Sequence, residues 1–259
     1  MNIHQIYARN ELRNFTYIIE LNDQTAIVID PWDDKEIDQQ LESRNLSLKI
    51  IINTHEHWDH IQGNLALVKK HHCEVWAHKN GKGKIPGLTR ILVADETIAL
   101  DDEYEFLVLD TPGHTFAHLC FLLKKREKAV AVFTGDTLFN AGVGHCRGGG
   151  DEEVLYKTIS EQFQILSDDI IVYPGHDYLE NNLKFTLKFE PNNQDAKEWL
   201  EQTQKTNYIP GSLQTTIGNE KSFNTFMRLD NDEIIKNLAL NSSKAKDVFL
   251  ALRSFRDSW

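Results

Sequence analysis

The chain has 259 residues, 41% of them hydrophobic and 26% charged, so it can form a sizeable core arranged as one or two domains. Its formal net charge of −11 repels nucleic acid and anionic membranes, and we therefore expect neither as a partner. Residues 1–13 contain no apolar run that suits a secretion signal or a membrane span, which predicts a cytoplasmic protein.

The three cysteines, Cys73, Cys120 and Cys146, stand at wide and irregular spacings. An odd number in this arrangement suits buried thiols better than a disulfide framework. The pattern therefore favours a reducing compartment.

Apolar, β-branched runs bounded by polar or turn-forming residues predict strands along the first 175 or so residues. These runs cover residues 15–21, 25–30, 48–53, 106–109, 119–123, 130–134 and 170–173, and helical spacing covers 61–71 and 152–166. The sequence therefore predicts a mixed α/β domain, residues 1–177.

From residue 178 onward the pattern becomes helical, which predicts a C-terminal helical domain, residues 178–259. Helices are expected at 179–189, 194–205, 232–240 and 243–255. The stretch 207–223 contains Pro210, Gly211 and Gly218, and its turn chemistry predicts a connection between helices across the surface.

Four potential metal ligands follow the predicted strand 48–53 within six residues: His55, His57, Asp59 and His60. Imidazole and carboxylate groups bind zinc and other first-row metals, and ligands just past a strand end point into one crevice. The alternative is a polar loop rich in histidine. Chance assembly of H-x-H-x-D-H is roughly one in a thousand for a chain of this composition, which favours a metal site.

Three further predicted strands end in a segment with one candidate ligand each: His114, Asp136 and His176. A histidine after a glycine turn is by itself more often a cap or a surface residue. Because every segment follows an apolar strand and precedes a loop, all four could present ligands at a single edge of the sheet.

The order H-x-H-x-D-H, a lone histidine, Gly-Asp and Gly-His resembles the metallo-β-lactamase superfamily. The resemblance implies an α/β (α+β) fold, the αβ/βα sandwich, with two divalent metal ions at one edge of two packed sheets. By position, it assigns His55, His57 and His114 to the first ion, Asp59, His60 and His176 to the second, and Asp136 to both. Zinc is the first expectation, and iron and manganese are alternatives, because mixed nitrogen and oxygen ligands accept all three.

Asp30 matches a family position behind the site, from which it could orient a ligand. A turn residue at a strand end is the equal alternative. His118, four residues after His114, also resembles a position near the site, but on a strand it is more often a buried core histidine.

Two adjacent divalent ions generate hydroxide near neutral pH and polarise a carbonyl, so no side-chain nucleophile is required. A thiolate, with a pKa of about 8.5, leaves without a proton donor, and a thioester therefore suits this site. Asp136, between the ions, and Asp59, which could hold or deprotonate the water, are the candidate catalytic residues.

Residues 134–144, TGDTLFNAGVG, and 173–191, YPGHDYLENNLKFTLKFEP, are similar to the hydroxyacylglutathione hydrolase (glyoxalase II) family. The similarity covers essentially the whole chain and implies hydrolysis of S-(2-hydroxyacyl)glutathione, such as S-D-lactoylglutathione, to glutathione and a 2-hydroxy acid. Tyr178, Arg253 and Arg256 match family positions that contact glutathione. Because residues three apart share a helix face, both arginines could reach one anionic ligand, although a solvated helix end is the alternative.

The segment 144–150, Gly-His-Cys-Arg-Gly-Gly-Gly, departs from the family pattern. A basic position becomes His145 and a tyrosine position becomes Arg147, so both are candidate substrate-binding residues. Arg147 could supply the missing positive charge, or the change could indicate a different thiol carrier. Cys146 is interpreted as a bystander.

Two alternatives to glutathione thioester hydrolysis stay open at this point. Glutathione persulfide dioxygenases share the fold and much of the motif, but they use a single iron and generally lack a long helical C-terminal domain. Hydrolysis of another thioester is the second alternative. The oligomeric state is expected to be a monomer or a weak oligomer.

Overall fold

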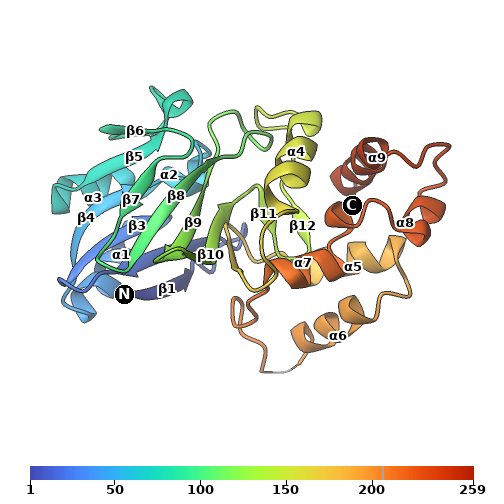
Figure 1. Cartoon of the computed structure of the whole chain (residues 1–259). Coiled ribbons are helices and arrows are strands. Elements are labelled where there is room, and N and C mark those ends of the chain that lie inside the picture. Colours follow the sequence, from blue (N-terminus) through green and yellow to red (C-terminus); the bar gives the residue numbers. More distant parts are fainter. Residues whose placement is uncertain (206) are drawn as a thin grey trace.

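Two β-sheets pack face to face, and helices cover both outer faces (Figure 1). The computed structural model describes residues 1–205 and 207–259. The first sheet has the order β1-β2-β3-β4-β5-β6: β1 (Asn2–Tyr7), β2 (Phe15–Glu20), β3 (Thr25–Ile29), β4 (Ser47–Ile52), β5 (Glu74–His78) and β6 (Arg90–Leu92). The second has the order β13-β10-β9-β8-β7: β7 (Thr97–Ala99), β8 (Tyr104–Asp110), β9 (Leu119–Lys125), β10 (Lys128–Gly135) and β13 (Ile171–Pro174).

Strand β9 shows how the sequence builds both faces of the second sheet. Successive side chains of a strand point to opposite faces, so alternate residues enter different cores. Leu119, Phe121 and Leu123 pack in the core between the two sheets. Cys120 and Leu122 pack in the core on the opposite face, beneath helices. The first five residues of β9 are therefore apolar because both faces of the strand are buried there.

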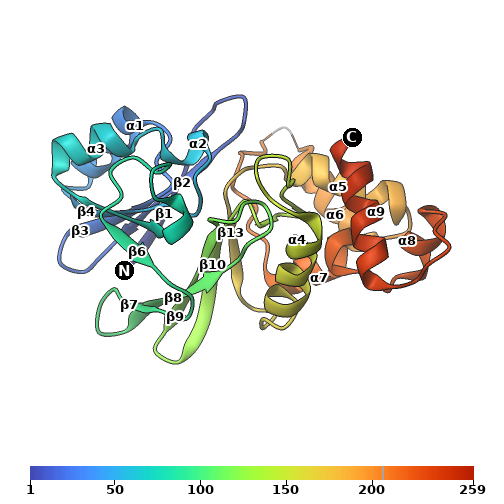
Figure 2. The ribbon, with the colours of Figure 1, turned by 90° about the horizontal axis from the view of Figure 1, so that it is seen from above.

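Helices α1 (Asp34–Ser43) and α3 (Asn64–His71) cover the outer face of the first sheet, where they bury Ile37, Leu41 and Leu67 (Figure 2). Helix α4 (Glu152–Thr158) and the π-helical turn Ile159–Phe163 cover the outer face of the second sheet. This layer order confirms the predicted αβ/βα sandwich.

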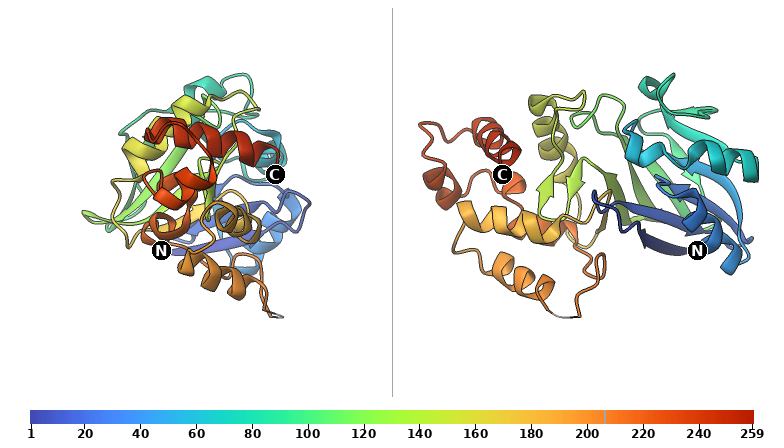
Figure 3. Two further views of the ribbon diagram at one scale, coloured as in Figure 1. Left: turned by 90° about the vertical axis from the view of Figure 1, so that its right-hand side faces the viewer. Right: turned by 180° about the vertical axis from the view of Figure 1, so that it is seen from behind.

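The C-terminal helices gather at the end of the sandwich where α4 lies (Figure 3). They are α5 (Leu179–Phe189), α6 (Gln194–Thr203), α7 (Ile217–Phe223), α8 (Asp232–Asn237) and α9 (Ala245–Asp257). Phe185, Phe226 and Phe249 share one core with Leu155 of α4. No helix among the described residues has both the length and the apolar character required to cross a membrane.

The predicted strands all exist, with ends shifted by one or two residues in most cases, whereas several short elements were not predicted. Strands β1 and β5 and helix α1 were among the elements missed, and α1 contains only two apolar residues, Ile37 and Leu41. The prediction of a connection over 207–223 was wrong in its second half, which forms α7. Thr216 and Asn219 form a capping box that starts this helix, and the box outweighs Gly218 as a local signal.

The short hairpin of β11 (Leu138–Phe139) and β12 (Gly142–Val143) lies against the C-terminal helices, and its turn forms hydrogen bonds with α5 and α7. Glu220 of α7 is fully buried against it and accepts hydrogen bonds from the Ala141 backbone N (2.8 Å) and from Asn224 Nδ2 (2.9 Å). Its second oxygen, Oε1, has no hydrogen-bond partner within the described part of the chain. Burial raises the pKa of Glu220 from 4.5 to about 7.

This raised pKa predicts a pH-dependent contribution of Glu220 to stability. Between pH 4.5 and about 7 the unfolded chain loses this proton while the folded chain keeps it. The stabilisation is therefore complete below pH 4.5 and is lost as the pH rises through about 7. Glu220→Gln cannot ionise at this position. When the pH is raised from 5 to 8, the unfolding free energy of the variant should therefore increase by up to about 3 kcal/mol relative to that of the wild type. Denaturant unfolding of both metal-free proteins measures this difference, and an equal difference at the two pH values would contradict the assignment.

Candidate metal centre

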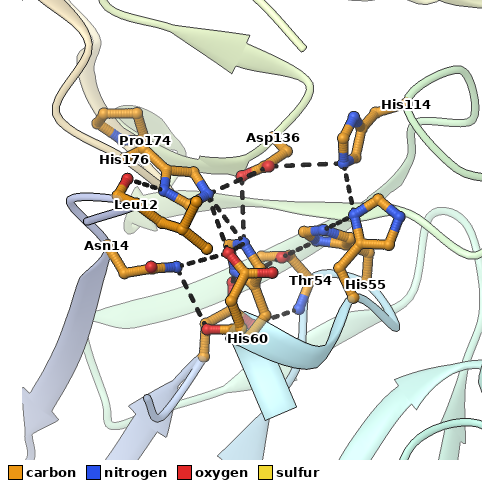
Figure 4. A network of polar contacts seen from close by, with 12 residues as sticks. Leu12, Asn14, Thr54, His55, His60, His114, Asp136, Pro174 and His176 are labelled. Atoms are coloured by element: carbon orange, nitrogen blue, oxygen red, sulfur yellow. Dashed lines mark hydrogen bonds and ion pairs between the residues drawn. The ribbon is translucent and has the colours of Figure 1, made fainter. Parts of the chain in front are cut away.

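Seven side chains from four segments converge at one edge of the sandwich, as the sequence predicts (Figure 4). The short helix α2 (Trp58–Ile61) and the loop before it follow β4, and the other segments follow β8, β10 and β13. The ligand atoms lie within 4.8 Å of one another in each of two groups: His55, His57, His114 and Asp136 in the first, and Asp59, His60 and His176 in the second. A further overlapping group joins Asp30 to His55 and His60.

Four of the five histidines direct Nε2 toward the centre and hold Nδ1 with a hydrogen bond or close polar contact behind it. The contacts at Nδ1 are His55 with Thr54 Oγ1 (3.0 Å), His60 with Asp30 Oδ2 (2.9 Å), His114 with the His145 carbonyl (2.5 Å) and His176 with the Leu12 carbonyl (2.8 Å). Such outer contacts fix the ring and the tautomer of a metal-binding histidine.

His57 is turned the other way. Its Nε2 donates to the Gly148 carbonyl (3.1 Å), and its Nδ1 lies 3.0 Å from His55 Nε2 and 2.9 Å from His114 Nε2. Three ring nitrogens therefore converge on one point. This arrangement is typical of a zinc-type site with nitrogen ligands.

The Asp136 carboxylate lies between the two groups. Its Oδ2 is 3.5 Å from His114 Nε2 and 3.3 Å from His176 Nε2, and its Oδ1 is 3.3 Å from His60 Nε2. Oδ1 is buried and has no hydrogen-bond partner among the described residues. A buried carboxylate oxygen without a partner is costly, and a divalent cation would satisfy it. The residues therefore fit a site for metal ions that Asp136 shares.

Protonation of the two groups differs in a way that suits cation binding. Burial opposes a charge on His60, but Asp136, Asp30 and Asp59 raise its pKa to about 10. Burial lowers the pKa of His114 to about 4, so its ring is neutral near pH 7 with a free lone pair. A metal ion at the second group must therefore displace the His60 proton, so metal binding there releases a proton.

Asp30 and His118 lie directly behind the ligands. Asp30 Oδ1 accepts from the Thr54 backbone N (2.8 Å), and Oδ2 lies 2.9 Å from His60 Nδ1, a position from which it could orient this ligand. The Nε2 of the buried His118 accepts from the Asp136 backbone N (3.1 Å). His118 is thus a buried core histidine, the more frequent alternative, and it also contacts the backbone of Asp136.

The segment 144–150, which differs from the family pattern, packs against the ligands. A side chain at Gly148 would collide with the His57 ring, and one at Gly150 would collide with the backbone of Gly113 and His114. The glycines therefore allow this backbone to approach the metal centre closely. Cys146 is buried in the apolar core, and burial raises the pKa of its thiol to about 12, in agreement with the bystander interpretation.

A cavity of about 290 Å³ opens over the ligands and a cavity of about 210 Å³ lies beside it toward α9. The two share Phe139, His145 and Tyr178 as walls. Phe139 was not predicted as a site residue, and a lone aromatic on a short hairpin gives no sequence signal. The remaining predicted substrate-binding residues, Arg147, Arg253 and Arg256, line the second cavity.

The three arginines differ in how firmly they are held. Arg253 is buried, and its Nη1 donates to the carbonyls of Val143 (2.9 Å) and Gly144 (3.0 Å). Its Nη2 also pairs with Asp257 at 3.0 Å. By contrast, the Arg256 guanidinium makes one hydrogen bond among the described residues, from Nη2 to Asn182 Oδ1 of α5 (2.9 Å). Arg147 is exposed and donates to the Asp257 carbonyl (2.7 Å). Arg256 and Arg147 therefore keep more donors available for an anion than Arg253 does.

Comparisons with known proteins cover the whole chain. The family model described as the metallo-beta-lactamase superfamily matches residues 9–176, and the model described as the hydroxyacylglutathione hydrolase C-terminus matches residues 177–259. Hydroxyacylglutathione hydrolases from Polaromonas sp. strain JS666 and Nitrosococcus oceani are 40% and 38% identical, and each alignment covers 100% of both chains. Among solved structures, ETHE1 from Myxococcus xanthus has a TM-score of 0.68 at 26% identity and covers 98% of this chain and 99% of its own.

The chain belongs to the hydroxyacylglutathione hydrolase family. Membership and the His/Asp cluster together make it a protein that binds divalent metal. The resemblance drawn from the sequence is confirmed. The match of the helical segment to this family also favours a hydrolase over the single-iron dioxygenase.

We expect Asp136→Ala to remove most of the bound metal, because both carboxylate oxygens face ligand groups. Elemental analysis of the purified variant should give less than half of the wild-type metal content. The rate of S-D-lactoylglutathione hydrolysis should fall by at least about 100-fold. Asp38→Ala is the control, since this α1 carboxylate pairs with the side chains of Lys70 and His71. Full metal content in Asp136→Ala would contradict the shared-ligand geometry.

Proposed function

We propose that this member of the hydroxyacylglutathione hydrolase family cleaves S-(2-hydroxyacyl)glutathione, such as S-D-lactoylglutathione, with two divalent ions per chain, zinc being the preferred metal. The observation that carries the proposal is the shared wall between the ligand cluster and the arginine-lined cavity. A substrate in this groove would place its thioester over the ligands and its glutathione part among the arginines.

The seven side chains at the sandwich edge would hold the ions: His55, His57, Asp59, His60, His114, Asp136 and His176. When bound, the ions lower the pKa of water and polarise the thioester carbonyl. Asp136 would hold both positions at a fixed separation. Asp59 lies at the mouth of the cavity over the ligands, where its carboxylate could orient or deprotonate water.

The glutathione part carries two carboxylates, which must be captured by local charge because the chain as a whole is acidic. Arg256 and Arg147 offer exposed or partly exposed guanidinium groups at the cavity, and His145 lies between this cavity and the ligands. Tyr178 stacks on His176 with ring centroids 4.9 Å apart. Burial raises the pKa of Tyr178, so its hydroxyl stays a hydrogen-bond donor at neutral pH.

We further propose that residues 1–177 form the metal-binding domain and residues 178–259 the substrate-binding domain. A cytoplasmic location is supported by the three cysteines, which are free and buried thiols. The acidic surface supports the absence of nucleic acid and membrane partners. A monomer or weak oligomer remains the proposed state.

Metal-loaded protein should hydrolyse S-D-lactoylglutathione with a kcat/KM above about 10⁴ M⁻¹s⁻¹. The same lactoyl thioester on coenzyme A is the control carrier, and we expect much slower turnover because its thiol part does not match the arginine-lined cavity. Equal turnover of both carriers would indicate that the segment 145–150 no longer selects glutathione.

Arg256→Ala should raise KM for S-D-lactoylglutathione about 10-fold and change kcat less, since a lost charged hydrogen bond costs about 1.5 kcal/mol in binding. Steady-state kinetics measure this split. Arg44→Ala, directly after the distant helix α1, is the matched control and should leave both constants unchanged. An unchanged KM in Arg256→Ala would remove this arginine from the proposed glutathione site.

A further inference from the structure

The loop between β1 and β2 contacts the second ligand group from the outside (Figure 4). The Leu12 carbonyl accepts from His176 Nδ1 (2.8 Å), and Asn14 forms an isolated β-bridge with His176. The Phe15 backbone N donates to the Gly175 carbonyl (2.8 Å). This loop therefore fixes the segment that carries His176.

The Asn14 side chain extends the same support to a second ligand, Asp59. Asn14 is only 1% exposed, and its Nδ2 donates to Asp59 Oδ2 (2.9 Å) and to the Asp59 carbonyl (3.2 Å). Asp59 Oδ2 is also the oxygen that faces the other ligands, at 3.5 Å from His60 Nε2 and 3.4 Å from His176 Nε2. Because a carboxylate oxygen accepts more than one partner, it can receive the amide and a cation together.

The orientation of the Asn14 amide is itself fixed. Asn10 Nδ2 donates to Asn14 Oδ1 (2.8 Å), and Asn10 Oδ1 accepts from the Asn14 backbone N (3.1 Å). An amide could otherwise turn its oxygen toward Asp59, where two acceptors would repel. The contact with Asn10 thus keeps the NH₂ end on the carboxylate.

We propose that Asn14 is a positioning residue of the second ligand group, acting through Asp59. Among the described residues, its side-chain hydrogen bonds go to Asp59 and Asn10 alone, and none goes to His55, His57 or His114. Its loss should therefore weaken the second metal selectively. The inference rests on the proposed function, specifically on the two ions per chain.

The test is a titration of metal-free protein with Zn²⁺ against a chelator of known affinity, which gives two stepwise dissociation constants. Asn14→Leu has a similar volume and no donor. We expect one of its two dissociation constants to rise roughly 10- to 100-fold, while the other changes by less than about 3-fold. Asn10→Ala, which keeps Asn14 but frees its amide, should show a smaller shift in the same direction and decides the case if Asn14→Leu does not fold.

Asn193→Ala is the matched control. Asn193 is also a buried asparagine, and it donates to Glu190 and to the Ser222 carbonyl and caps α6, but it contacts no ligand. It should lower thermal stability without changing either dissociation constant.

Wild-type affinity at both sites in Asn14→Leu, or an equal loss at both sites, would overturn the inference and leave the two-metal function standing. A single binding step in the wild type would instead contradict the proposed two-metal function, and the inference would fall with it.

Discussion

The structure depends on the position of one carboxylate, that of Asp136, between two groups of imidazoles. Its buried Oδ1 has no hydrogen-bond partner among the described residues, and its Oδ2 lies within 3.5 Å of His114 and 3.3 Å of His176. Nearby imidazoles, His176 and His60 first among them, hold the pKa of Asp136 well below its usual value despite its burial, so the carboxylate stays charged and available to a cation. The surrounding fold therefore holds the ligands in place for metal, and metal binding should also stabilise the folded chain.

Asp136 directly precedes the β11–β12 hairpin, residues 138–143, which lies between the metal centre and the proposed substrate cavity. Directly after Asp136, the β11–β12 hairpin supplies Phe139 as a wall of both cavities and the Val143 carbonyl as an acceptor for Arg253. Its turn is held by the buried Glu220 of α7. The C-terminal helices, which we propose to bind substrate, thus also fix the backbone that follows Asp136.

The sequence predicted the parts of this structure that rest on strong local patterns. The apolar strands and the ligand-bearing loops that follow them could be located, because a strand end forces its loop to one edge of the sheet. Asn14 could not be predicted, since it lies in the N-terminal loop and reaches Asp59 only through the tertiary fold. Likewise, the hydrogen bonds from Arg253 to backbone carbonyls depend on how α9 packs, and the helical spacing of the sequence does not reveal this packing.

A crystal structure of the zinc-loaded chain with glutathione tests the account most directly. We predict two anomalous peaks, one among His55, His57 and His114 and one among Asp59, His60 and His176, with Asp136 contacting both. We also predict the thiol over the metals and a glutathione carboxylate at Arg256. A single metal peak, or glutathione bound away from the cavity between Phe139 and Arg256, would contradict the account.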